Sequence, residues 1–179
     1  MRDLTFLILL FFFSCSEKNS RQETEIDLRS QRITIIPDSV FEFKNLIKLE
    51  LGANEVIFYP PLSALPESNF EKNQISKLPE KISELKNLKV LIINSNDLKS
   101  LPNSISKLKN LEILDLALNK NLDIVAELSK LKLLPKLKIL KITDTKFDIE
   151  DLKIIKKSLE PKIKIVSSLN DYMESYGKQ

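Results

Sequence analysis

The feature that most constrains the fold of this chain is a repeated pattern of leucine, asparagine and proline. In its clearest copy, residues 88–110, the pattern is LxxLxLxxNxLxxLPxxIxxLKN. Apolar residues elsewhere fall into the same register when the chain is shifted by about 23 residues. Units begin at residues 23, 46, 65, 88, 111 and 137. A period of this length is typical of solenoids, in which each unit stacks on its neighbours because no unit buries its apolar side alone.

Each unit contains two kinds of segment. The LxLxxN part alternates with a period of two, which predicts a short strand, about residues 89–94 in the best copy. The asparagine turns the chain inward, where its amide satisfies backbone groups that are otherwise buried without a partner. The LPxxI part predicts a 3₁₀ turn or short helix, since proline costs little at the first helical position. A run of amphipathic helices does not account for the alternation.

This pattern resembles the typical class of leucine-rich repeats, those with an LPxxI segment, over residues 23–166. The resemblance implies an α/β solenoid of about six repeats. A parallel β-sheet would line its concave face, and short helices or 3₁₀ turns its convex face.

Three departures from the template are expected to change the structure of the coils in which they occur. The unit starting at 46 is four residues short, and it precedes an irregular unit at 65. Residues 122–134 have helical spacing, so the convex helix of the fifth unit should be the longest. Residues 148–159 are amphipathic and precede a final strand at 163–165, which together are typical of a C-terminal cap. Residues 167–179 are expected to form a partly ordered tail.

The N-terminus is typical of an export signal. Residues 4–13 are mostly apolar and would span about 15 Å as a helix, half of a membrane's hydrocarbon core of about 30 Å. They are followed by Ser14 and by Cys15, the only cysteine in the chain. This arrangement resembles a bacterial lipoprotein signal, although Phe12 and Phe13 stand where that signal has leucine and a small residue.

The resemblance implies a signal peptide at residues 1–14 and a lipidated Cys15 with a flexible tether at 15–22. The array would then occupy residues 23–166 and the tail 167–179. Lipid at Cys15 would anchor the exported chain in the bacterial envelope, with the outer membrane favoured by Ser16. An ordinary cleaved signal, or an apolar N-terminal helix with a bystander cysteine, is the alternative.

Composition argues against catalysis and cofactors. The chain has no histidine, one cysteine and two glycines. It therefore lacks a histidine-based nucleophile pair, an imidazole or thiolate metal cluster and a glycine-rich phosphate loop. We therefore expect that this protein is not an enzyme and uses no metal or cofactor. The second half is basic, but its lysines are dispersed and lack an aromatic platform, so nucleic acid is not the expected partner.

The strand pattern also predicts a binding surface. Residues beside the inward leucines point to the concave face. At the N-terminal end they are polar and acidic, and further along they form an apolar stripe edged by charge, typical of an interaction site. The candidate residues are Val90, Ile92, Ile113, Asp115, Leu118, Ile139 and Lys141. The alternative is that these aliphatic residues merely suit a strand.

These observations favour a membrane-anchored, monomeric module that binds a protein ligand without turnover. A structural component of the bacterial envelope is the second interpretation. An intracellular repeat scaffold is the third, if residues 1–14 are not a signal.

Overall fold

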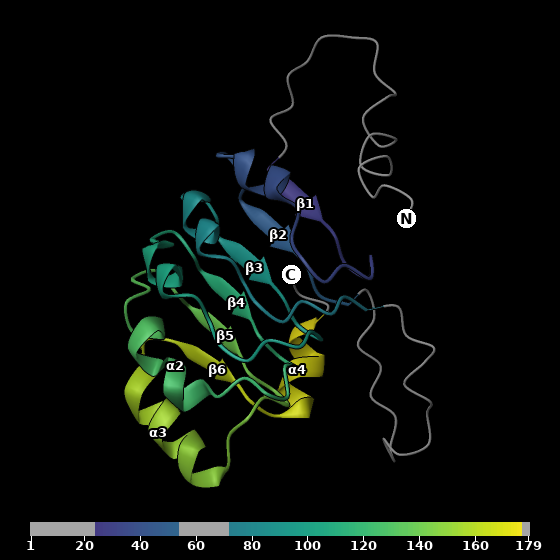
Figure 1. Ribbon diagram of the computed structural model, residues 1–179. Helices are drawn as coiled ribbons and strands as arrows, with labels where there is room; N and C mark the ends of the chain where they lie inside the picture. Colours follow the sequence, from purple (N-terminus) through teal and green to yellow (C-terminus); the bar gives the residue numbers. More distant parts are fainter. Residues whose placement is uncertain (1–23, 54–71, 177–179) are drawn as a thin grey trace, which may run out of the picture.

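The chain winds into a solenoid whose strands form one parallel sheet (Figure 1). This computed structural model describes residues 24–53 and 72–176. The strands lie side by side in chain order, and each pairs with the next in parallel. They are β1 (Glu25–Asp27), β2 (Lys48–Glu50), β3 (Val90–Ile92), β4 (Ile113–Asp115), β5 (Ile139–Lys141) and β6 (Lys164–Val166). The leucine-rich-repeat architecture predicted from the pattern is therefore confirmed.

The central residue of each strand faces the interior. Leu49, Leu91, Leu114 and Leu140 pair in one register across β2 to β5, and all four are fully buried. Stacking each leucine on the next removes the apolar side of every coil from water, which is the main stabilising term of such an array.

The convex side carries 3₁₀ turns in the early coils and α-helices in the later ones. The turns are η2 (Asp38–Glu42), η5 (Glu80–Glu84) and η6 (Asn103–Lys107), and each follows a proline. The helices are α2 (Ile124–Leu131) and α3 (Ile149–Leu159). Asp148 caps α3 by accepting from Asp151 N at 2.8 Å. The helical spacing at 122–134 and 148–159 thus predicted the two convex helices. The expectation that the helix of the fifth unit is the longest is wrong, because α2 has 8 residues and α3 has 11.

Asparagines form a ladder through the interior, as the pattern predicts. Asn96 is 3% exposed; its Nδ2 donates to Leu51 O at 3.0 Å and its Oδ1 accepts from Ile75 N at 2.9 Å. Asn119 makes the equivalent bonds one coil later, donating to Ile93 O at 3.0 Å. Within the described residues, every buried side-chain nitrogen and oxygen has a hydrogen-bond partner.

The strand expected in the unit starting at 65, near residues 67–69, falls outside the described residues. Among the described strands, β2 pairs directly with β3. The sixth strand is β6, near the end of the array. The repeat pattern assigns Asn54 to the unit starting at 46, but this residue is not among the described ones. In the structure, Asn73 makes the ladder contacts of the second coil, with Nδ2 donating to Leu28 O and Leu51 O at 2.8 Å each. Residues 54–71 lie outside the described residues.

The chain after β6 continues into another helix. Residues 167–179 were expected to form a partly ordered tail, and within them the structure has α4 (Leu169–Tyr176). In Figure 1 it lies beside the ends of β5 and β6, apart from α2 and α3. Across the part of the chain that is described, no helix combines the length and the apolar character needed to span a bilayer.

Candidate binding surface on the concave face

The N-terminal part of the concave face carries a group of paired charges. Arg29 Nη2 lies 2.7 Å from Asp27 Oδ2, and Arg29 Nη1 lies 3.6 Å from Glu50 Oε1. Lys48 Nζ lies 3.2 Å from the other oxygen of Glu50. Hydrogen bonds from Arg29 lower the pKa of Asp27. Glu25 and Asp27 are exposed at the outer edge of this group.

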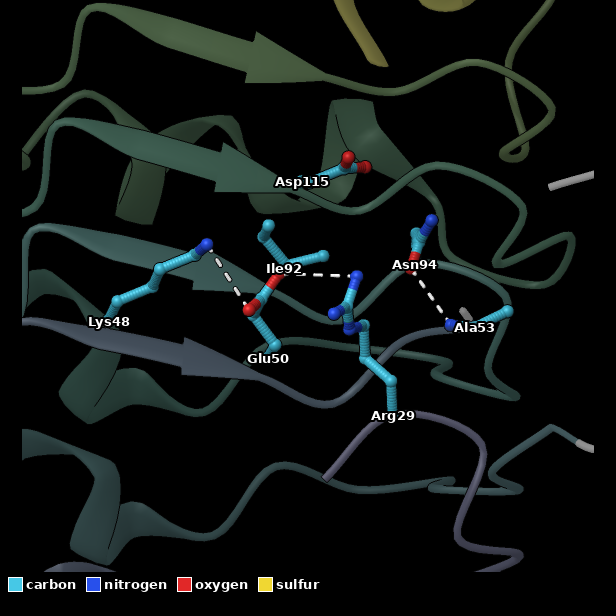
Figure 2. Close-up of a pocket in the computed structure, with 7 residues that line it drawn as sticks. All are labelled: Arg29, Lys48, Glu50, Ala53, Ile92, Asn94 and Asp115. Carbon is cyan, nitrogen blue, oxygen red and sulfur yellow. Dashed lines mark hydrogen bonds and ion pairs between the residues drawn. The ribbon is translucent and has the colours of Figure 1, made fainter. Parts of the chain in front are cut away.

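These charges border a hollow of about 170 Å³ in the concave face. Figure 2 shows Lys48, Glu50 and Arg29 converging below Ile92, with Asp115 on the next strand. Its lining residues are Arg29, Lys48, Glu50, Ala53, Ile92, Asn94 and Asp115. The lining presents both signs of charge on rigid strands, and such a surface is suited to polar recognition of a partner.

The C-terminal part of the concave face is covered by α4. Tyr172 is fully buried and packs with Ala117 and Val166. Its hydroxyl accepts from Asn94 Nδ2 at 2.7 Å and donates to Asp115 Oδ2 at 3.1 Å. One tyrosine thus joins the tail of the chain to the third and fourth coils.

A buried ion pair lies beneath this tyrosine. Lys141 Nζ is 3.7 Å from Asp115 Oδ2 and 5.2 Å from the centre of the Tyr172 ring. Burial raises the pKa of Asp115 to about 6, although the nearby Lys141 charge opposes the shift. Burial also lowers the pKa of Lys141. Because both charged forms are desolvated, the pair adds little net stability to the fold. Both side chains also contact α4, Asp115 at the Tyr172 hydroxyl and Lys141 at Ser175 O.

The predicted binding residues all lie on the concave side, but they do not form an open stripe. Ile92, Asp115 and Lys141 are 5%, 1% and 2% exposed. The others are half-buried; Ile139 and Leu118 pack against the Tyr172 cluster. The expectation that these slots are exposed is therefore wrong for three of the seven residues, and the binding role of the set stays a prediction.

Sequence reasoning missed the residues that organise this face: Arg29, Asn94 and Tyr172. A signal for α4 was present, because Leu169, Tyr172, Met173 and Tyr176 follow helical i, i+3, i+4, i+7 spacing. Ser168 caps this helix, accepting from Asp171 N at 3.2 Å. Nothing in that spacing indicates which surface the helix covers.

Among the described residues, no group of three or more histidine, cysteine, aspartate or glutamate side chains could hold a metal ion. Cys15, the predicted lipidation site, lies outside the described residues.

Stacked parallel coils, buried leucines and an asparagine ladder define this chain as a leucine-rich-repeat solenoid. The fold matches 84 chains of solved structures. One is a leucine-rich-repeat protein of Leptospira interrogans, with 27% identity and a TM-score of 0.47 over 75% of this chain. The match covers 40% of that protein, so this chain spans less than half of its length. No family model and no curated protein matches this chain.

Proposed function

We propose that this chain is a lipid-anchored, non-catalytic module that binds a protein ligand in the bacterial envelope. The observation that carries the binding role is the open end of the concave face. There, Glu25, Asp27 and Lys48 project from adjacent strands beside a hollow lined with charges of both signs. Rigid strands hold these side chains in place, which reduces the entropy lost on binding.

Site-specific cross-linking tests the binding role. A photoreactive residue at Glu25, which is exposed on the concave face, is expected to capture one discrete protein in intact cells. The same residue at Lys107, exposed at the end of η6 on the convex side, is the matched control. Equal capture at the two positions, or none at Glu25, contradicts a binding role for this face.

The anchor is a separate part of the proposal and rests on the apolar run that ends at Cys15. Cells grown with radioactive palmitate should label the wild-type chain and not Cys15→Ala, with Ser16→Ala as the labelled control. Protease treatment of intact cells then tests for surface exposure, and fractionation tests for the outer membrane. Label that persists in Cys15→Ala contradicts the anchor without affecting the binding test.

A further inference from the structure

Helix α4 buries one of its described side chains in the concave face. Of residues 169–175, only Tyr172 is buried; Leu169 and Met173 are 40% and 49% exposed. Helices shorter than about 12 residues are marginal in water, and α4 has eight. Its order therefore depends on the site that receives Tyr172, here called the Tyr172 socket and formed by Asn94, Asp115, Ala117, Lys141 and Val166.

The socket recognises three features of its occupant. Asn94 and Asp115 bind the phenol hydroxyl as donor and acceptor, at 2.7 and 3.1 Å. The ammonium of Lys141 lies 5.2 Å from the ring centre, within the range of a cation–π contact. Lys141 Nζ also lies 3.5 Å from Ser175 O, in the last turn of α4, where a helix presents free carbonyls and partial negative charge.

The array itself positions the polar groups of the socket. Asp115 Oδ1 accepts from Ala117 N at 3.1 Å, and Asn94 Oδ1 accepts from Ala53 N at 3.2 Å. Neither contact involves α4. A site whose polar groups are preorganised in this way loses little entropy when it binds another occupant of the same chemistry.

Helix α4 does not fill the surface that it covers. A groove of about 210 Å³ remains between the helix and the strands. Its strand side carries Ile113, Ile139 and Val166, and its helix side carries Asp171 and Glu174. Helix α4 therefore packs closely against the strands at Tyr172 and leaves a groove open beside that residue.

We propose that the Tyr172 socket is a recognition site for a tyrosine-bearing helical segment of a partner protein, and that α4 is an intramolecular competitor for this site. The partner's tyrosine lies three residues before the carbonyl that Lys141 binds, as Tyr172 does before Ser175. This inference rests on the proposed protein-binding role of the concave face, and it assigns the C-terminal part of that face to one kind of ligand.

The test uses the full chain carrying Tyr172→Ala, which vacates the socket, and a fluorescent peptide of residues 168–176. Fluorescence anisotropy should show the peptide binding this variant at least tenfold more tightly than wild type, where α4 competes. A peptide with alanine at the position of Tyr172 keeps its second tyrosine and should not bind. Absence of binding to a folded variant, or equal binding of both peptides, overturns the proposal.

Hydrogen exchange on the wild-type chain decides the question if Tyr172→Ala does not fold. Amides of α4 should exchange at least 100-fold faster than those of β3 and β4, because a competitor must open while the array stays folded. Exchange of α4 at the rate of the strands would make it a permanent part of the fold and overturn the proposal. Failure here, together with capture at Glu25, would remove the socket and leave the proposed function standing.

Discussion

Gly52 and Asn94 are in such close contact that only glycine, which has no Cβ, fits at position 52. A Cβ at Gly52 would lie 1.6 Å from Asn94 Oδ1, whereas real contacts of this kind exceed 3.0 Å. The same Asn94 side chain accepts from Ala53 N and donates to the Tyr172 hydroxyl. The lack of a side chain at Gly52 thus leaves room for the Asn94 amide, which donates to Tyr172 of α4.

Gly52→Ala should therefore displace Asn94 and destabilise the chain by about 1–3 kcal/mol, the usual cost of overpacking an interior. Urea denaturation followed by circular dichroism measures this change. If the clash is the cause, most of the loss from Gly52→Ala should disappear in an Asn94→Ala background, as a double-mutant cycle reports. Additive losses would place the cause in the backbone around Gly52 instead.

Asn73 should be essential for stability, because it makes the ladder contacts of the second coil. Asn73 is fully buried; its Oδ1 accepts from Gln31 N and Ile33 N at 3.0 and 3.1 Å. Asn73→Ala leaves these two donors and the Leu28 carbonyl without partners, whereas Leu51 O keeps its bond from Asn96, and the loss should cost at least about 2 kcal/mol of unfolding free energy. Asn121→Ala, at an exposed position, is the matched comparison, with an expected change within about 0.5 kcal/mol. The reverse order in urea denaturation would contradict the placement of Asn73.

The repeat pattern located the core more reliably than it divided the chain between β2 and β3 into units. Inward leucines such as Leu91 and Leu114 follow from periodicity, because their burial is repeated in every coil. The template has asparagine at both 54 and 73, and the pattern alone does not say which of them belongs to the coil of β2. The contacts of Asn73 with Leu28 O and Leu51 O assign it to that coil.

The candidate site was less predictable, because its key contact joins residues far apart in the chain. Tyr172 and Asp115 are separated by 57 positions, and no repeat relates them. Strand alternation correctly placed Asp115 and Lys141 on the concave face. Their burial depends on the docking of α4, which is a tertiary contact without a local signal.

Tyr172→Phe should loosen α4 while leaving the array folded. The change keeps the ring but leaves Asn94 Nδ2 and Asp115 Oδ2 without the hydroxyl that each now bonds. Amide exchange of α4 should rise on the order of tenfold, the effect of losing a buried hydrogen bond of about 1.4 kcal/mol. Met173→Leu, at an exposed position of the same helix, is the control and should leave exchange unchanged. Equal rates in wild type and Tyr172→Phe would mean that the hydroxyl does not hold the helix.

Asp115 should make the chain more stable at acidic pH. Burial raises its pKa to about 6 from 3.8, so the folded state binds a proton more readily than the unfolded state. The resulting stabilisation is complete below pH 3.8 and is lost as pH rises through about 6. A shift of about two units corresponds to about 3 kcal/mol.

Other carboxylates have pKa shifts in the opposite direction. Hydrogen bonds from Ser104 and Lys138 lower the pKa values of Glu80 and Glu112, respectively. Comparison with Asp115→Asn separates the contribution of Asp115 from theirs. Unfolding free energies of both proteins are compared at pH 7.5 and pH 4.0. Since asparagine does not titrate, the wild type should gain stability relative to the variant as pH falls. A difference that stays constant would mean that the pKa of Asp115 is the same in the folded and unfolded states. A difference that changes in favour of the variant would mean that the fold lowers this pKa; either result contradicts the prediction.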